Sequence, residues 1–181
     1  MFVRESAVAA GAITVRPAQI EDMASVQAIY AHYVLTGLAT FEEAPPSVGE
    51  MLSRRAKTVA AGFPYLVAMR QGAVVGYCYA SSYRPRPAYR FSVEDSVYVD
   101  KNYVGKKIGT ALLKALLDRC MAGPWHQMLA VIGNSGNAGS IALHHRLGFK
   151  PVGTITAVGF KLGQWVDTVM MQRALKPGRA A

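Results

Sequence analysis

The sequence predicts a mixed α/β fold in which helices are interspersed among the strands of one sheet. Segments with strand-like and helix-like hydrophobic spacing follow one another in the order β-α-α-β-β-β-α-β-α-β-β. At least four of the strands meet through short hairpins, which does not fit a regularly doubly wound sheet. A length of 181 residues, 51% of them apolar, suits one domain with a substantial core.

Each element rests on a local pattern. In chain order we expect a strand at 13–17, helices at 20–35 and 47–60, two strands within 65–83, a strand at 91–100, a helix within 104–117, a strand at 127–133, a helix at 137–148 and a hairpin within 152–172. Ser47 is a candidate N-cap, with Glu50 three residues on completing a capping box. Gln71-Gly72 and Leu162-Gly163 supply the hairpin turns.

The two ends of the chain and its cysteines indicate the cellular compartment in which we expect the protein. Residues 1–12 are small and apolar without a basic start, so we expect a flexible extension rather than a signal peptide, and a flexible tail at 174–181. No apolar run approaches the roughly 20 residues that span a bilayer. Cys78 and Cys120 lack neighbours at metal-ligand spacing, so we expect two buried reduced thiols in a cytoplasmic protein and no metal.

The net charge of +9 favours an anionic partner such as a phosphorylated cofactor. The basic residues are scattered, apart from "RPRPAYR" and "GKK", and no basic stripe is interleaved with aromatics. Nucleic acid is therefore a weak interpretation, and neither a nucleic-acid partner nor a membrane is expected.

The stretch "VYVDKNYVGKKIGTALLKALL", residues 97–117, is the strongest local signal. A strand passes through glycines and lysines into a Leu-rich helix, whose first turn has free N–H groups and a partial positive charge. Such a start can bind phosphate, although a glycine-containing strand-to-helix connection is also a common structural device. The N–H groups expected at the site belong to Gly105, Lys106, Lys107, Ile108, Gly109 and Thr110.

Several segments together resemble one family. The 97–117 stretch is similar to the acetyl-CoA motif of the Gcn5-related N-acetyltransferases, Gln/Arg-x-x-Gly-x-Gly/Ala. "VRPA", "TFEEAPPS", "RPRPAYRFSVEDSVYV", "AVIGNSGNAGSIALHHRLGF" and "GFKLGQWVDTVMMQR" resemble its phosphinothricin and methionine sulfoximine acetyltransferase branch. The resemblance covers residues 13–173. It implies a single acetyltransferase domain with a largely antiparallel, splayed sheet, and acetyl-CoA as the co-substrate.

The coenzyme motif departs from the family pattern at two positions. Val104 stands where the pattern has Gln or Arg, and Lys107 stands where it has the first Gly. If that position needs a left-handed backbone, Lys costs about 1–2 kcal/mol relative to Gly. The simpler expectation is that the helix begins here with ordinary dihedral angles. The sharper hypothesis is that the amines of Lys106 and Lys107 add to pyrophosphate binding.

The resemblance implies two catalytic residues. It places the family's catalytic acid at Glu94, which in a strand shares one face with Ser96 and Tyr98; an exposed strand carboxylate is the alternative. His144 stands where many superfamily members have a Tyr that protonates the leaving thiolate, and the narrower branch also has His there. An imidazole can donate a proton near neutral pH, but a purely structural hydrogen bond is equally compatible with the sequence.

Further coenzyme contacts follow from the same resemblance. Asn137 is expected to touch the coenzyme as well as to cap its helix, and Ser140 completes the pattern. The backbone of Val97, Tyr98 and Val99 is expected to pair with the amides of the pantetheine arm as an added strand would.

The acceptor side is expected just before the catalytic strand. Arg84 and Arg86 suit a substrate carboxylate, and prolines stiffen their loop; a solvated basic loop is the alternative. The residues expected to bind the acceptor are Phe41, Arg84, Pro85, Arg86, Tyr89, Glu94, Asp95 and Ser96. Asp95 fits solvent or the substrate wall. Lys161 and Trp165 match family positions at either the pocket or a dimer seam.

These features predict an N-acetyltransferase that moves acetyl directly to the α-amine of a small amino-acid-like acceptor. Phosphinothricin, methionine sulfoximine and methionine sulfone are the model acceptors, and the family suggests a homodimer. No Cys or Ser sits in an activated setting, so no acyl-enzyme is expected. The alternatives are another amine, such as a peptide N-terminus or polyamine, and a non-catalytic acyl-CoA-binding regulator.

Overall fold

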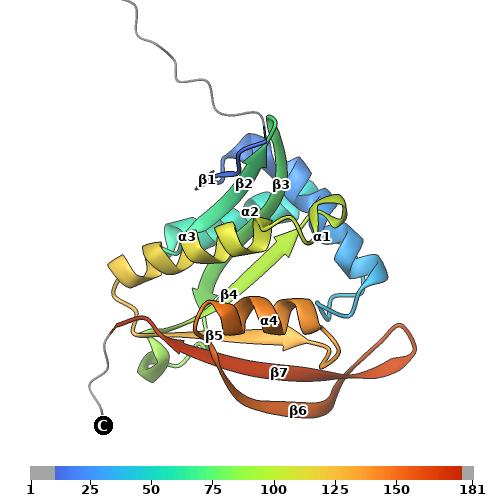
Figure 1. Ribbon diagram of the computed structural model, residues 1–181, viewed down its shortest axis with the longest axis vertical. Helices are drawn as coiled ribbons and strands as arrows, with labels where there is room; N and C mark the ends of the chain where they lie inside the picture. Colours follow the sequence, from blue (N-terminus) through green and yellow to red (C-terminus); the bar gives the residue numbers. More distant parts are fainter. Residues whose placement is uncertain (1–10, 177–181) are drawn as a thin grey trace, which may run out of the picture.

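The computed structural model describes residues 11–176, and residues 1–10 and 177–181 lie outside the description. Figure 1 shows one twisted sheet with helices on both faces. The elements are β1 (Thr14–Pro17), α1 (Met23–Thr36), α2 (Val48–Ala60), β2 (Tyr65–Arg70), β3 (Ala73–Ser82), β4 (Ser92–Val99), α3 (Ile108–Ala122), β5 (Gln127–Gly133), α4 (Ala138–Arg146), β6 (Lys150–Lys161) and β7 (Gln164–Ala174), with short 3-10 turns at Ile20–Asp22, Pro87–Tyr89 and Lys101–Tyr103. The predicted order of strands and helices is therefore confirmed.

The sheet changes direction at one place. Within residues 11–176 it has seven strands in the order β1-β2-β3-β4-β5-β7-β6, and every neighbouring pair is antiparallel except β4 and β5. The parallel pairing of β4 with β5 joins 92–95 to 127–130. β4 continues to pair with β3 as far as Val99, so the two halves of the sheet separate beyond Asp95. The splayed sheet expected from the resemblance is confirmed.

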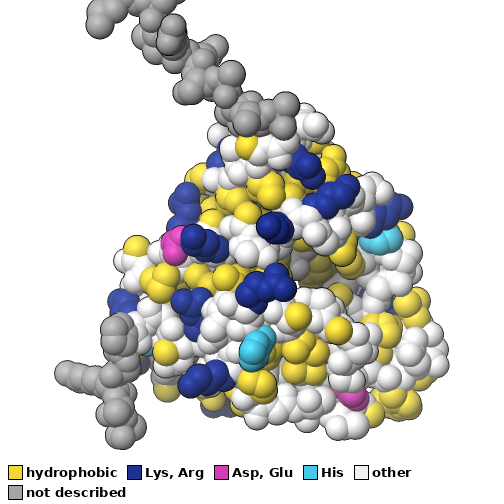
Figure 2. All heavy atoms as spheres, viewed as in Figure 1, with side chains coloured by type: hydrophobic (Ala, Val, Ile, Leu, Met, Phe, Trp, Pro, Cys, Tyr) yellow, Lys and Arg dark blue, Asp and Glu magenta, His cyan; other side chains and the backbone are white. Residues whose placement is uncertain are grey.

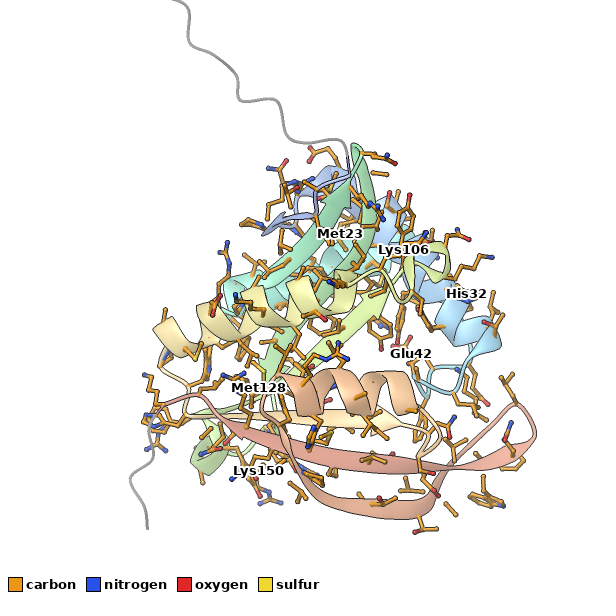
Figure 3. The ribbon with its side chains drawn as sticks, viewed as in Figure 1. Met23, His32, Glu42, Lys106, Met128 and Lys150 are labelled. Carbon is orange, nitrogen blue, oxygen red and sulfur yellow. The ribbon has the colours of Figure 1, made fainter. Side chains whose placement is uncertain are left out.

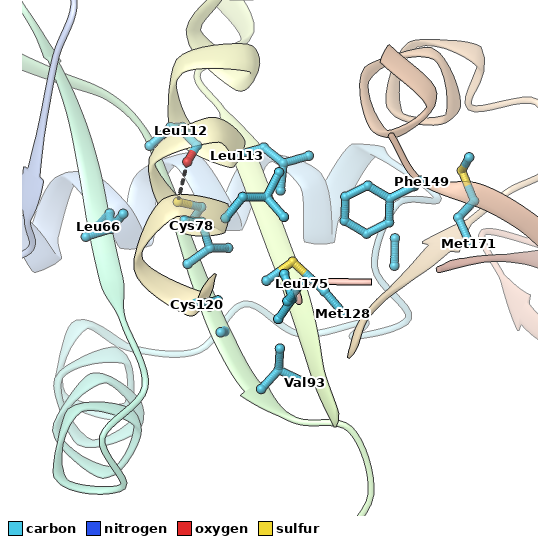
Figure 4. Close-up of a cluster of buried hydrophobic side chains, with 14 of the residues drawn as sticks. Leu66, Cys78, Val93, Leu112, Leu113, Cys120, Met128, Phe149, Met171 and Leu175 are labelled. Carbon is cyan, nitrogen blue, oxygen red and sulfur yellow. Dashed lines mark hydrogen bonds between the residues drawn. The ribbon is translucent and has the colours of Figure 1, made fainter. Parts of the chain in front are cut away.

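Side-chain alternation along the strands produces a hydrophobic core on each face. One core joins α1 and α2 to side chains such as Met23, Tyr65, Val67 and Tyr77. The other joins α3 to alternate residues of the same strands, such as Leu66 and Cys78 of β2 and β3, and extends to β5 and β7 (Figure 4). In Figure 3, Met23 lies inside the molecule, and it is fully buried.

α3 packs closely on the sheet because one strand position has no side chain. A Cβ at Gly76 would lie 3.0 Å from Leu112 Cδ1 and 2.9 Å from the Tyr98 carbonyl oxygen. The Cys78 thiol, one strand position further on the same face, donates to the Leu112 carbonyl at 3.5 Å (Figure 4). Burial raises the pKa of Cys78 well above its usual value and that of Cys120 to about 12, so both thiols stay protonated. The expectation that both are buried is confirmed.

Two local predictions need correction. The Ser47 hydroxyl accepts from the Glu50 N–H at 3.1 Å, but the Glu50 carboxylate pairs with Arg54 at 2.9 Å, so half of the capping box is present. The ordered fold also extends beyond the predicted boundary at 174. Leu175 is buried in the core and its N–H donates to the His126 carbonyl at 2.9 Å, because an apolar side chain there completes the packing under β5.

No helix within residues 11–176 is long and apolar enough to cross a membrane.

Candidate active site

A cleft opens where β4 and β5 separate. It has a volume of about 570 Å³, and its walls come from β4, β5, the start of α3 and the helix α4. Figure 2 shows Lys and Arg side chains over α3 and between α3 and α4, with few acidic side chains on this face. Of the residues predicted to contact a coenzyme, the lining includes Val97, Tyr98, Val99, Val104, Gly105, Lys107, Gly109, Thr110, Asn137 and Ser140.

The open edge of β4 carries backbone groups that no strand uses. The Asp100 N–H donates to the Val75 carbonyl and the Tyr83 N–H to the Ser92 carbonyl, so the even-numbered residues of β4 form the ladder with β3. In an antiparallel pair the alternate residues face the other edge. Val97 and Val99 therefore direct their N–H and C=O groups toward the cleft, where residues 11–176 contribute no pairing strand.

This alternation corrects one of the three backbone predictions. The backbone of Tyr98 belongs to the ladder with β3, and its ring packs among tyrosines, 5.2 Å from the Tyr77 ring and 5.1 Å from the Tyr30 ring. The Val99 carbonyl accepts from the Tyr33 hydroxyl at 2.5 Å, which ties α1 to the same edge. The groups left for a ligand are both groups of Val97 and the N–H of Val99.

The connection into α3 contains two residues with positive φ. Gly105 has φ of 78°, and Lys107, the residue before α3, has φ of 64° and ψ of 8°. The expectation of ordinary dihedrals at Lys107 is therefore wrong: the left-handed position that suits glycine is occupied by lysine. The first intrahelical bond runs from Ala111 N–H to the Lys107 carbonyl at 3.1 Å. The N–H groups of residues 108–110 thus remain without an acceptor inside the helix.

The two lysines and Ile108 have different surroundings. The Lys106 N–H donates to the Tyr103 carbonyl at 3.2 Å, and its ammonium group donates to the Asn102 carbonyl at 2.8 Å. Lys106 is therefore engaged with its own turn, contrary to the expectation that it presents its N–H to a ligand. Lys107 lines the cleft, whereas the Ile108 side chain is buried in the core.

α4 begins at the cleft and packs on α3. The Asn137 side-chain oxygen accepts from the Ser140 N–H at 3.2 Å, which is the predicted N-cap. A Cβ on Gly109 would lie 3.1 Å from Leu143 Cδ2, so a glycine at this position lets the two helices approach. Asn137 and Ser140 stay on the cleft wall while performing this structural role.

His144 and Asp95 form a buried pair at the floor of the cleft. The His144 Nε2 atom lies 3.0 Å from Asp95 Oδ2, and the Nδ1 atom lies 2.7 Å from the Ser140 carbonyl oxygen. The side chains are 5% and 2% exposed. Burial by itself lowers the pKa of His144, but the hydrogen bond and charge of Asp95 and the Ser140 carbonyl outweigh it and raise the pKa. Both ring nitrogens therefore lie within hydrogen-bond distance of protein oxygens.

This geometry bears on two predictions. Of the two expectations for Asp95, solvent and the substrate wall, the first is wrong, because the side chain is buried against His144 of α4. Asp95 does lie among the residues that line the cleft. Both ring nitrogens of His144 contact protein oxygens, and its role as the proton donor to the coenzyme sulfur stays a prediction.

Glu94 lies next to Asp95 on the other face of β4. It pairs in register with Ser81 of β3 and is half-buried. Burial and, secondarily, the charge of Asp95 raise the pKa of Glu94 to about 7, while the charge of Arg84 lowers it. A carboxyl with a pKa near neutrality can accept a proton under ordinary conditions.

The predicted acceptor loop lies at the start of this strand. Arg84 is exposed, with its guanidinium carbon 5.2 Å from the centre of the Tyr83 ring, and its charge reaches Glu94. Tyr89 meets the same ring edge-on at 5.6 Å. Pro85 and Arg86 are exposed on the same loop. The structure thus brings a cationic, aromatic loop to the end of β4 that carries Glu94.

A second loop, residues 37–43 between α1 and α2, is held by β5 and β6. A Cβ on Gly133 would lie 2.5 Å from the Leu38 carbonyl oxygen, and one on Gly159 would lie 2.4 Å from the Phe41 ring. The Lys161 ammonium donates to the Thr40 carbonyl at 2.7 Å. Lys161 is 2% exposed, so its position is inside the fold and neither an open pocket wall nor a free surface. Trp165, by contrast, is 68% exposed.

Several cleft residues were not anticipated. Tyr33, Ala39, Gly133 and Arg146 also line the cleft. Arg146 follows the "HH" pair on α4, so its charge is a signal that sequence reasoning could have used. The contributions of Tyr33 and Ala39 depend on how α1 and its loop cross the sheet, for which the sequence has no marker. In Figure 3, the labelled residues His32 and Glu42 lie near the end of α1.

The residues present fit a coenzyme A thioester and offer no metal site. The free strand edge at Val97 and Val99 suits an amide-bearing arm, and the helix start at 108–110 suits a pyrophosphate. Among residues 11–176 no group of three His, Cys, Asp or Glu side chains could hold a metal ion. The fold and this cleft define an acyltransferase that uses an acyl-coenzyme A donor.

Comparisons with known proteins agree. The model of the acetyltransferase (GNAT) family matches residues 26–149. A phosphinothricin N-acetyltransferase of Alcaligenes faecalis is 52% identical over 167 residues, 92% of this chain and 85% of the relative. An L-methionine sulfoximine/L-methionine sulfone acetyltransferase of Pseudomonas paraeruginosa is 39% identical over 169 residues, 93% of this chain and 98% of the relative.

A solved structure extends the likeness to the fold. It is a GNAT superfamily phosphinothricin acetyltransferase from Sinorhizobium meliloti in complex with acetyl-CoA, with 49% sequence identity and a TM-score of 0.90 over 93% of this chain and 91% of that one. The chain belongs to the GNAT family of acetyltransferases. Its co-substrate is acetyl-CoA.

Proposed function

We propose that this enzyme acetylates the α-amine of a small amino-acid-like acceptor such as phosphinothricin, methionine sulfoximine or methionine sulfone. The observation that carries the proposal is Glu94: a half-buried carboxyl with a pKa of about 7, on the strand β4 that borders the cleft and within reach of the charge of Arg84. The acceptor class is supported by the names of the relatives that are 52% and 39% identical.

Glu94 acts as the general base. An amino acid's α-amine is mostly protonated at neutral pH and reacts only as the free amine, so a group near the acceptor has to remove its proton. Burial and the neighbouring Asp95 make the Glu94 carboxylate a stronger base than an exposed glutamate, and the charge of Arg84 offsets part of this effect. At neutral pH a substantial fraction of Glu94 is therefore ionised and ready to accept a proton.

The cleft holds the acetyl donor. When bound, acetyl-CoA supplies an activated acetyl group. The free amine attacks the thioester carbonyl carbon, the C–S bond breaks, and the proton that the nitrogen loses on forming the amide balances the one that the sulfur gains as the coenzyme leaves as its thiol. The backbone of Val97 and Val99 would hold the pantetheine amides. Gly105, Lys107 and the N–H groups of 108–110 would hold the pyrophosphate, and Asn137 and Ser140 would contact the coenzyme beside them.

The acceptor is bound between two loops. Arg84 and Arg86 would bind its carboxylate, with Tyr89 and the stiffening Pro85 on the same loop. Phe41 would close the opposite side, because its ring is seated on Gly159. Ser96 lies two residues after Glu94, on the same face of β4, and would border the amine.

A homodimer is part of the proposal. β6 forms an edge of the sheet, and its side chains are exposed along most of the strand. Long apolar edge strands are normally covered in folded proteins. The exposed apolar side chains on this hairpin are Val152, Ile155, Val158, Phe160, Leu162 and Trp165. A second copy of the chain is the partner that the family relationship favours. We place the enzyme in the cytoplasm, which suits its two buried thiols.

The test is a turnover screen that follows release of the coenzyme A thiol. Phosphinothricin, methionine sulfoximine, methionine sulfone, ordinary amino acids, spermidine and an N-terminal peptide are compared as acceptors. The proposal expects the highest kcat/KM among the first three. A preference for spermidine or the peptide would show that the proposed acceptor class is wrong. Thiol release that does not depend on any added amine would contradict acetyl transfer to an amine.

A further inference from the structure

Asp95 is the last residue of β4 that pairs with β5. Its register partner is Ala130, and beyond this pair the two strands separate to form the cleft. Its carboxylate is buried on the α3 and α4 side of the sheet and contacts His144 of α4 at 3.0 Å. A hydrogen bond therefore connects the cleft strand with the helix on the opposite wall, at the point where the sheet opens.

We propose that Asp95 is a positioning residue of the acetyl-transfer site, which fixes the His144 ring across the floor of the cleft and places a negative charge behind Glu94. The part that concerns Glu94 rests on the proposed role of Glu94 as the base. The part that concerns His144 rests on the observed contacts alone.

The ring of His144 is restrained from both ends. Asp95 accepts the proton of Nε2, and the Ser140 carbonyl, one turn earlier in α4, accepts that of Nδ1 at 2.7 Å. The ring also meets the Phe149 ring edge-on, with centroids 5.0 Å apart. With Nδ1 bonded to its own helix, the hydrogen bond from Nε2 to Asp95 joins the imidazole to β4. Removing that acceptor leaves the Nε2 proton buried without this partner.

The two oxygens of the Asp95 carboxylate have different surroundings: Oδ2 contacts His144, and Oδ1 does not. Oδ1 is buried and has no hydrogen-bond partner within the described part of the chain. Four ionisable groups face this charge: Glu94 on the same strand, His144 on α4, Cys78 on β3 and Cys120 on α3. Both thiols are held protonated, so the charge acts on His144, whose protonated form it stabilises, and on Glu94, whose ionised form it opposes.

The surroundings of Glu94 show what else contributes. Arg84, from the loop before β4, opposes the effect of Asp95, and Tyr79 of β3 lies near enough to sense the Glu94 charge. Burial is the largest cause of the raised pKa of Glu94, and Asp95 follows it. Loss of the Asp95 charge is therefore expected to shift the titration of Glu94 without abolishing its raised position.

A merely structural ion pair makes a different prediction. A buried pair can be replaced by neutral groups with little change in function if all it does is hold the fold. The readout that distinguishes the two is therefore the pH profile of kcat/KM, while the titration of the His144 ring reports the contact with Asp95 itself. Neither is expected to move with stability alone.

The experiment compares Asp95→Asn with Asp118→Asn in the full chain. Asp118 is exposed on α3 and serves as a matched control for the same chemical change. The best acceptor of the turnover screen is used, and the His144 ring is followed by 15N-resolved NMR. For Asp95→Asn we expect the acid limb of kcat/KM to move to lower pH by about half a unit or more. We also expect the His144 ring to lose its second proton at a lower pH than in the parent, with both profiles unchanged in Asp118→Asn.

The outcomes separate the two parts of the proposal. In folded Asp95→Asn, an unchanged acid limb overturns the part that concerns Glu94, and an unchanged His144 titration overturns the part that concerns His144. If Glu94→Gln retains the parent's pH profile, the assignment of the base is wrong, while the NMR titration still decides whether Asp95 controls His144. If Asp95→Asn does not fold, Asp95→Glu provides the comparison, because it retains the charge but displaces it: the proposal then expects a shifted His144 titration, and an unshifted one contradicts it.

Discussion

The ammonium group of Lys161 donates a hydrogen bond to the carbonyl of Thr40, 121 residues earlier in the chain, at 2.7 Å. The lysine comes from the last residue of β6, and the carbonyl belongs to the loop that carries Phe41. The same ammonium group lies 3.5 Å from the Tyr33 carbonyl in the last turn of α1, where a cation is favourable. One buried charge thus fixes the loop that we propose closes the acceptor site.

Replacement of this lysine should loosen the acceptor loop. In Lys161→Met the stem is kept, but the Thr40 carbonyl loses its donor, which costs about 1–3 kcal/mol of stability. We expect a lower Tm and a higher KM for the acceptor, with a smaller change in KM for acetyl-CoA. Lys150→Met, at an exposed position of the same strand, is the control. Equal effects on the two KM values would argue against a role specific to the acceptor loop.

Glu94→Gln should separate activity from stability. We expect kcat/KM to fall by about 10²–10⁴, because the proposed base is removed. In the parent, kcat/KM should rise as pH increases through about 7, where Glu94 ionises.

The same substitution should raise the stability of the protein above neutral pH, although it lowers the activity. The pKa of Glu94 is raised in the folded protein from 4.5 to about 7, so its contribution to stability is complete below pH 4.5 and is lost as pH rises through 7. Glu94→Gln should therefore have a higher Tm than the parent at pH 8 and a similar Tm near pH 4.5. Glu21→Gln, an exposed change, should alter neither property. Parent-like turnover in Glu94→Gln would remove Glu94 from the mechanism.

Lys107 carries both a strained backbone and a charge, which two substitutions separate. Lys107→Ala keeps the cost of the left-handed conformation and removes the charge, so coenzyme A binding should weaken while Tm stays nearly constant. Lys107→Gly relieves the strain and should raise stability by up to about 1 kcal/mol, reduced by the greater freedom of glycine in the unfolded chain. Calorimetry gives both affinities. Tighter coenzyme binding by Lys107→Gly than by the parent would show that the ammonium group is not used.

Gly159 tests the seating of Phe41. An added Cβ would lie 2.4 Å from the Phe41 ring, so Gly159→Ala must displace the ring. We expect a higher KM for the acceptor and a lower Tm, with partial recovery in the Gly159→Ala, Phe41→Leu double variant because the smaller side chain relieves the clash. Gly153→Ala, on the same strand, is the matched control, because no atom lies within 4 Å of its added Cβ. Parent-like kinetics in Gly159→Ala would show that Phe41 does not shape the site.

The exposed face of the β6–β7 hairpin predicts a change in oligomeric state. Val158→Asp and Trp165→Lys place charges where apolar side chains are 52% and 68% exposed. If a second copy covers this face, each variant should shift the mass measured by light scattering from dimer toward monomer. Val59→Lys, an exposed apolar position on α2, is the control. A parent chain that is monomeric at all accessible concentrations would contradict the proposed dimer.

The sequence alone determined the elements of this protein and the general position of its site. Hydrophobic periodicity, the caps at Ser47 and Asn137 and the glycine turns are local signals, so the order of strands and helices could be predicted from them. The strand that leads through Gly105 into α3 is also local, and it borders the cleft that we propose holds the coenzyme. Glu94 could be proposed as the base because its motif lies in one continuous segment.

Tertiary structure decided which groups meet. The contact of Asp95 with His144 could not be predicted, because no local signal shows that α4 brings His144 to it, 49 residues later. The alternation that leaves Val97 and Val99 free, and commits Tyr98 to β3, depends on the register of an antiparallel pair. Lys161 and Gly159 reach residues 40–41 only after β6 folds across the end of the sheet. Charge, burial and close approach are properties of neighbours in space, and the spacing of residues along a chain does not specify them.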